Sequence, residues 1–124
     1  MERIFTELYK DIHESAQAGQ DPFKRFLFGT RQNILIIFYV ASQVGQKTTL
    51  EDICYNLSPK VVSRSTIQNT LKEGIKINFF KKEINENDKR QKFYKLTDEA
   101  SKIMQDWAYK QNTIFSNLSD LIKR

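Results

Sequence analysis

The sequence predicts a mainly α-helical protein with one small β-hairpin. Apolar residues recur at helical spacing through most of the chain, and residues that commonly begin or end helices separate these segments. Strand-like composition is confined to two short runs on either side of a polar turn. A length of 124 residues suits one compact domain, so residues 1–124 are expected to form a single unit.

Two helices are expected near the N-terminus. Helical spacing of apolar residues predicts an amphipathic helix over residues 2–18, and these residues are Ile4, Phe5, Leu8 and Ile12. Asp21 and Pro22 then form a typical helix start, a capping residue followed by proline at the first helical position. A short aromatic-rich helix should follow, as far as residue 28.

The middle of the chain is expected to contain three further helices. The first follows Thr30 and is apolar over much of its circumference, which predicts a central place in the core. The second follows Thr49 and carries acidic residues in its first turn, where the helix dipole favours them. The third follows Ser63, with Ile67 and Leu71 on its inward face.

The hairpin and a last helix complete the predicted fold. Asn78 is placed to adopt the left-handed conformation that commonly ends a helix. Residues 79–84 and 91–96 are expected to be strands, and residues 85–90 the turn between them. The last helix should run from residue 97 to about residue 122.

Composition argues against several function classes. With one cysteine and one histidine, the chain lacks the ligands of a structural zinc site and cannot form an internal disulfide. No nucleophile signature and no glycine-rich phosphate loop is present, so we expect no catalytic residues, no cofactor and no enzyme activity. No apolar run approaches the length of a membrane span, and the N-terminus lacks a secretory pattern, which favours a cytoplasmic protein.

Positive charge is concentrated in one segment. The formal net charge is +5, and residues 1–46 and 98–124 are each neutral. Residues 47–97 hold eleven basic and six acidic side chains and therefore carry the whole excess. Such a distribution is typical of a module that binds a polyanion, although a solvated basic surface without a partner would look the same.

The helix after Ser63 has the composition of a DNA recognition helix. Three helices followed by a hairpin are typical of a winged helix-turn-helix, in which the third helix enters the major groove. Arg64 can pair with guanine, and Gln68 and Asn69 can each bond adenine. The predicted recognition residues are Ser63, Arg64, Ser65, Thr66, Gln68, Asn69 and Lys72.

The hairpin, residues 79–96, would act as the wing. Its cationic tip can lie against a phosphate backbone or insert Arg90 into a narrow minor groove. The alternative is a hairpin whose lysines only keep it soluble. The predicted wing contacts are Lys82, Asp88, Lys89, Arg90 and Lys92.

Several motifs occur in an order known from one family. Along the chain come Ser63 to Ile67, Leu71, Asn78 to Phe80, Asp88 to Arg90 and Tyr94 to Ala100. This succession resembles the MarR family of bacterial transcription regulators and is similar to its compact staphylococcal SarA-type relatives. The resemblance spans about residues 31–107, and the Asp-x-Arg at the hairpin tip is its most specific part.

The resemblance implies a function and several partners. It implies a bacterial, nucleoid-associated regulator of double-stranded DNA, acting as a homodimer through its terminal helices. It also implies that Arg90 enters the minor groove while Asp88 holds the wing in place. A small-molecule effector, bound between the dimer helices and the winged part, is implied by the resemblance alone.

The last helix carries a stripe at heptad spacing that favours a dimer independently. Its members are Met104, Trp107, Gln111, Ile114, Leu118 and Leu121, apolar except for Gln111. A helix at the chain end has little of its own domain to pack against, so it should pack on the first helix and on a second subunit. A monomer with paired terminal helices is the alternative. The predicted interface consists of Ile4, Phe5, Leu8, Ile12, Met104, Trp107, Ile114, Leu118 and Leu121.

These observations define one domain with three functional parts. Residues 1–28 are expected to serve the core and dimerisation, residues 31–97 to bind DNA, and residues 98–124 to form the C-terminal dimerisation helix. The favoured function is a transcriptional regulator that reads a pseudo-palindromic site. An architectural protein with little sequence preference and a winged-helix protein-interaction module remain alternatives. Cys54 is interpreted as an inert buried thiol rather than a redox sensor.

Overall fold

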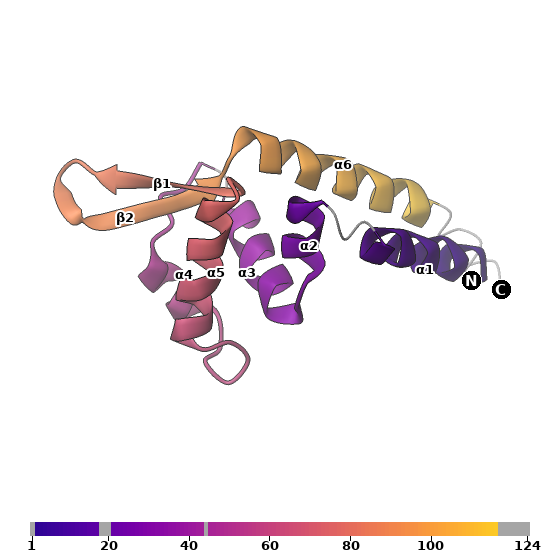
Figure 1. Cartoon of the computed structure of the whole chain (residues 1–124), viewed down its shortest axis with the longest axis horizontal. Coiled ribbons are helices and arrows are strands. Elements are labelled where there is room, and N and C mark those ends of the chain that lie inside the picture. Colours follow the sequence, from indigo (N-terminus) through magenta and orange to yellow (C-terminus); the bar gives the residue numbers. More distant parts are fainter. Residues whose placement is uncertain (1, 18–20, 44, 117–124) are drawn as a thin grey trace.

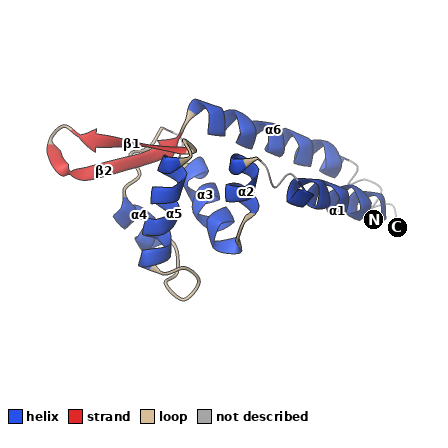
Figure 2. Cartoon of the chain, viewed as in Figure 1, coloured by secondary structure: helices blue, strands red, loops and turns tan. Residues whose placement is uncertain are grey.

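A computed structural model describes residues 2–17, 21–43 and 45–116 of the chain. Its elements, in order, are α1 (Glu2–Gln17), α2 (Pro22–Phe28), α3 (Arg31–Ser42), α4 (Leu50–Asn56), α5 (Arg64–Lys76), β1 (Phe80–Asn85), β2 (Asp88–Leu96) and α6 (Asp98–Phe115) (Figure 1). Figure 2 shows the hairpin as the only strands in these described ranges. The predicted class, mainly helical with a β-hairpin, is confirmed.

The helix starts form where capping side chains predict them. Thr30 accepts a hydrogen bond from the backbone N–H of Asn33, and Ser63 accepts one from that of Thr66. Thr49 and Asp52 form a reciprocal capping box at the start of α4. Each cap satisfies a backbone donor that the helix leaves without a partner, so local chemistry fixes these boundaries.

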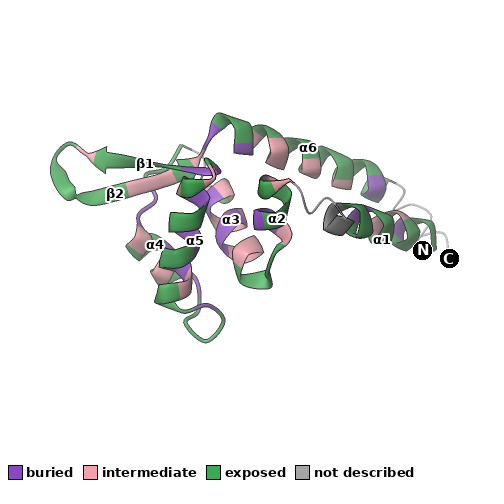
Figure 3. Cartoon of the chain, in the orientation of Figure 1, coloured by how far each residue is buried: buried purple, intermediate pink, exposed green. Residues whose placement is uncertain are grey.

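The core lies between the short helices and the root of the hairpin. α3 lies centrally in the core, as the sequence predicts, and much of it is coloured as buried or half-buried in Figure 3. Ile36 and Ile37 on it are fully buried. Phe79 and Phe80 are buried as well, and both stack edge-to-face on Phe26 of α2. These aromatic contacts join α2, the end of α5 and the start of β1 into one packed unit.

The junction of α5 and the hairpin depends on two special backbone positions. Gly74 lies so close to the Phe80 ring that a Cβ at residue 74 would overlap it. Asn78 has a φ of 65°, the left-handed conformation expected from the sequence. The chain therefore turns sharply, and β1 begins directly beside the C-terminal end of α5.

The hairpin has a shorter turn than the sequence predicts. β1 and β2 pair antiparallel from Phe80↔Leu96 to Asn85↔Asp88, with an irregularity after Ile84. The expected turn over 85–90 is wrong, because residues 88–90 belong to β2. The Asn85 side chain accepts a hydrogen bond from the backbone N–H of Asn87, which closes the turn within fewer residues.

Helices α1 and α6 form an arm on the side of the core opposite the hairpin (Figure 1). Ile4 and Ile114 are buried in it. Asp11 of α1 is also buried, and its carboxylate accepts hydrogen bonds from Lys110 Nζ at 2.5 Å and Gln111 Nε2 at 3.0 Å. The arm is thus held by apolar packing and by one buried polar cluster.

Candidate nucleic-acid interface

Helix α5 presents one polar face to solvent and one apolar face to the core. Ile67, Leu71 and Gly74 are buried on the inner side. The outer side exposes Ser63, Arg64, Ser65, Gln68, Asn69 and Lys72, and Thr66 is half-buried. The structure therefore brings the predicted recognition residues together on one exposed helical surface of a size that the major groove admits.

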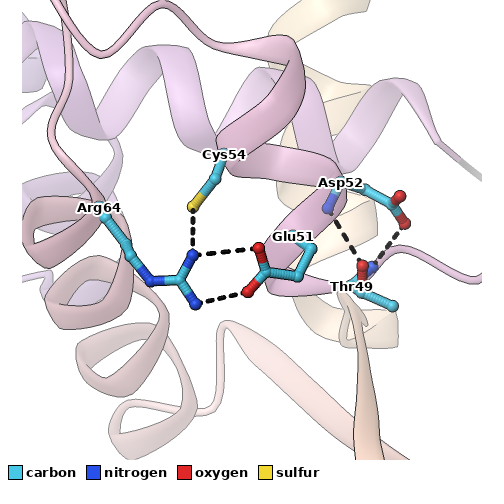
Figure 4. Close-up of polar contacts among 5 residues, drawn as sticks. All are labelled: Thr49, Glu51, Asp52, Cys54 and Arg64. Carbon is cyan, nitrogen blue, oxygen red and sulfur yellow. Dashed lines mark hydrogen bonds and ion pairs between the residues drawn. The ribbon is translucent and has the colours of Figure 1, made fainter.

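Arg64 is paired with a residue that the sequence analysis did not single out. Its Nη2 lies 2.5 Å from Oε1 of Glu51, and its Nη1 lies 3.1 Å from Oε2 (Figure 4). Nη1 also lies 4.0 Å from Sγ of Cys54. Glu51 is an acidic residue in the first turn of α4, and its place there was explained by the helix dipole alone.

The Arg64–Glu51 pair changes the acidity of both groups. The hydrogen bonds from Arg64 hold the pKa of Glu51 below its ordinary value, and the same bonds raise the pKa of Arg64. Both groups are therefore charged at neutral pH, and a bidentate ion pair joins the first turn of α5 to the first turn of α4.

The wing tip is braced by Asp88. Its Oδ1 accepts hydrogen bonds from the backbone N–H of Arg90 at 3.1 Å and from Nε of Arg90 at 3.3 Å. The Arg90 side chain is nevertheless 94% exposed. Asp88 thus fixes the backbone that carries Arg90 while the guanidinium projects into solvent.

The two faces of the hairpin differ in the ion pairing of their lysines. The register and the alternation of side chains place Lys82 and Lys92 on the same face. On the opposite face Lys95 is 2.5 Å from Glu83 and lowers the pKa of that carboxyl. Among the described residues Lys82 and Lys92 form no ion pair, whereas Lys95 on the opposite face does.

Helix α4 connects the recognition helix to the wing. An open hollow of about 610 Å³ lies between the start of α4 and the wing, with Glu51 on the α4 side and Asp88, Arg90 and Lys92 on the wing side. Because Glu51 also binds Arg64, the first turn of α5, the first turn of α4 and the wing tip form one continuous surface.

The predicted dimer residues have different surroundings. Ile4 and Ile114 are buried within this chain, and Leu8 and Met104 are half-buried. Trp107 is half-buried too, and its ring packs on that of Phe38 at 5.3 Å between centroids. Phe5 and Ile12 stay 59% and 67% exposed, as does neighbouring Tyr9 at 60%. Leu118 and Leu121 lie outside the described residues.

Other kinds of site find little support in the described ranges. His, Cys, Asp and Glu side chains form no cluster there that could hold a metal ion. No helix in those ranges is both long and apolar enough to cross a bilayer. Cys54 is half-buried beside the recognition helix rather than deep in the core.

Comparison with known proteins agrees with this geometry. No model of a protein family and no curated protein matches the sequence. Staphylococcus aureus MepR, solved in complex with DNA, matches with a TM-score of 0.60 at 16% identity, over 96% of this chain and 95% of its own. The heme sensor protein PefR from Streptococcus agalactiae gives 0.57 at 16% identity, over 92% and 72%.

Two further matches extend the comparison. The adhesin competence repressor of Streptococcus pyogenes has a TM-score of 0.56 at 16% identity, and the match covers 100% of this chain and 82% of the repressor. Lactococcus lactis ZitR has a TM-score of 0.54 at 19% identity over 69% of this chain, which spans only 57% of the ZitR chain. These neighbours are winged-helix regulators of the MarR family.

The chain has the MarR-type winged helix-turn-helix fold. In this fold α4 and α5 are the helix-turn-helix, the hairpin is the wing, and α1 and α6 form the arm. Helix α5 begins at Arg64, directly after the predicted cap Ser63.

Proposed function

We propose that this protein is a sequence-specific, DNA-binding transcription regulator of the MarR type. The observation that carries the proposal is the continuous surface formed by the outer face of α5 and the wing tip, with Arg64 and Arg90 at its two ends. Helix α5 would enter the major groove, and Arg90 would enter the adjacent minor groove. The segment 47–97, which holds the whole net positive charge, supports binding to phosphates.

We further propose that it acts as a homodimer through the arm. Phe5, Tyr9 and Ile12 leave an exposed apolar stripe on α1, and Phe115 of α6 is 46% exposed. A stripe of this kind is commonly covered in an assembly. A two-fold axis through the arm would place two α5 helices on successive major grooves, so the DNA site should be pseudo-palindromic.

An effector site is a smaller part of the proposal. A cavity of about 250 Å³ lies where α1, α2 and α6 meet, and Leu27, Phe28 and Trp107 form part of its lining. The heme complex of PefR supports the idea that a ligand can control a protein of this fold. The cavity in this chain is small, and it suits a ligand smaller than heme.

The function can be tested by fluorescence anisotropy. Purified protein is titrated into an AT-rich duplex, a mixed-sequence duplex and a duplex selected from a randomised library, at several salt concentrations. We expect binding that weakens log-linearly with salt and a large preference for the selected duplex. Equal affinity for all three would favour an architectural protein, and no binding at low salt would favour a protein-interaction module.

The dimer has its own test. Sedimentation equilibrium at micromolar concentration should give the mass of two chains. The variant Phe5→Asp/Ile12→Asp should give the mass of one chain, because two charges would have to be buried in the interface. A mass of one chain for the wild-type protein would contradict the dimer without affecting the DNA-binding proposal.

A further inference from the structure

The guanidinium of Arg64 is fixed in position by a carboxylate from another helix. Two parallel hydrogen bonds to Glu51 define the plane of the group as well as its location (Figure 4). The side chains of Arg64 and Glu51 are 53% and 71% exposed, so the pair lies at the surface and not in the core. Its position at the first turn of α5 is where a recognition helix contacts base edges.

The pairing leaves part of the guanidinium available. Arginine has five N–H donors, and a carboxylate that faces both Nη atoms takes one hydrogen from each. The remaining edge, formed by Nε and Nη2, presents two parallel donors. Guanine offers two acceptors, O6 and N7, in a matching arrangement in the major groove. Within the described parts of the chain, the acceptors that Arg64 meets are Glu51 and the sulfur of Cys54.

We propose that Glu51 is a specificity-determining positioning residue, which holds Arg64 so that its Nε–Nη2 edge is presented to a guanine. The inference rests on the proposed function, since it concerns how the recognition helix reads a base. Glu51 itself need not contact the DNA. Its role is to remove the rotamer freedom of a long side chain before binding, so that less entropy is lost when Arg64 meets the base.

Glu51 has a second effect on specificity through its charge. It faces the hollow that Arg90 and Lys92 line from the wing, so its carboxylate lies close to where phosphates would pass. A negative charge there weakens binding to DNA of any sequence. The proposal therefore predicts two effects of opposite sign when the charge is removed: stronger binding to random DNA and weaker discrimination at one base pair.

The test uses the variant Glu51→Gln, which keeps the size of the side chain but loses its charge. The matched control is Glu86→Gln, because Glu86 lies exposed in the hairpin turn and makes no contact with Arg64. A preferred duplex is selected with wild-type protein from a randomised library. Affinities are then measured for that duplex, for duplexes in which each G·C pair is replaced in turn, and for a random duplex.

We expect Glu51→Gln to bind the random duplex at least as tightly as wild type while losing about fivefold or more discrimination at one G·C pair. Glu86→Gln should bind the random duplex more tightly and keep the full discrimination. In an Arg64→Ala background, Glu51→Gln should leave the base preference unchanged, because the pair is already broken. Thermal unfolding of each variant checks that this surface change leaves the fold intact.

Two results would overturn the inference. Sharper guanine discrimination by Glu51→Gln would mean that Glu51 withholds Arg64 from DNA, and unchanged discrimination would mean that Arg64 is not positioned by it. In both cases the wild-type protein still prefers its selected duplex, so the proposed function stands. A wild-type protein that binds no duplex would overturn the proposed function and this inference together.

Discussion

Arg64 and Arg90 are both paired with a carboxylate, but in different ways. Arg64 is held by two bonds to Glu51, which comes from another helix, and about half of its side chain is exposed. Arg90 is held by a single Nε contact to Asp88, two residues earlier in its own strand, and is almost fully exposed. The first guanidinium is held by a contact between two helices, whereas the second is held by one contact within its own strand and projects into solvent.

The difference suits two modes of DNA readout. A base edge in the major groove demands a fixed donor geometry, which a bidentate tertiary contact supplies. Minor-groove width varies with sequence, and a side chain that can reorient adapts to it. In the proposed function, the Arg64 end of this surface would serve direct readout and the Arg90 end would serve shape readout.

The largest effect should come from weakening the core where α5, which carries Arg64, meets the hairpin, which carries Arg90. Phe79→Ala removes a fully buried ring that packs on Phe23, Phe26 and Phe80 where α5 meets the hairpin. It should lower the free energy of unfolding by about 3–5 kcal/mol, because a cavity remains in the core. Chemical denaturation measures this loss. Tyr55→Ala, at a ring on α4 that is 89% exposed, is the control and should change stability far less.

The second effect concerns the fixed arginine. Arg64→Ala should reduce discrimination at one G·C pair of the preferred duplex by about 1–3 kcal/mol and change affinity for random DNA much less. Anisotropy titrations of matched duplex pairs give both quantities. An equal loss of affinity for specific and random DNA would mean that Arg64 contacts the phosphate backbone, and the contrast with Arg90 would disappear.

The third effect concerns the arginine at the wing tip. Arg90→Ala should weaken binding and reduce the preference for AT-rich duplexes with a narrow minor groove. The matched control Lys89→Ala removes a neighbouring charge. It should weaken binding to all DNA sequences alike and lower the slope of log affinity against log salt concentration by about one. If the two variants behave identically, Arg90 acts as a phosphate contact only.

The smallest expected effect is a change in the pKa of Glu51. Because Arg64 holds the pKa of Glu51 below its ordinary value, the pair is present at neutral pH and is lost only as the pH falls through that lowered pKa. In Arg64→Ala, the titration midpoint of Glu51, followed by NMR, should rise towards the ordinary value. Glu83, whose pKa is lowered chiefly by Lys95, should keep its midpoint in the same variant and serves as the internal control.

The sequence predicts best those features that depend on neighbours along the chain. The caps at Thr30, Thr49 and Ser63 and the left-handed Asn78 follow from local backbone chemistry, and all are present. The amphipathic pattern of α5 likewise predicts which side chains face outwards, because burial follows helical periodicity.

Features that depend on distant residues were not predicted. Glu51 and Arg64 lie thirteen positions apart, and the pair exists because α4 and α5 cross at their first turns. The helix dipole by itself accounts for an acidic residue in the first turn of α4, so nothing in the local sequence around Glu51 indicates a partner. The predicted hairpin turn is too long. The polar residues 88–90 look like part of a turn, although backbone pairing extends to Asp88.

The buried Asp11 gives the arm a fixed register. A slip of α6 along α1 by one helical turn, about 5.4 Å, would remove Lys110 and Gln111 from the Asp11 carboxylate and leave a buried charge without donors. Apolar packing alone would tolerate such a slip much better than an unpaired charge does. In the proposed dimer the arm would set the distance between the two α5 helices, so the contacts of Asp11 would also fix the spacing of half-sites on DNA.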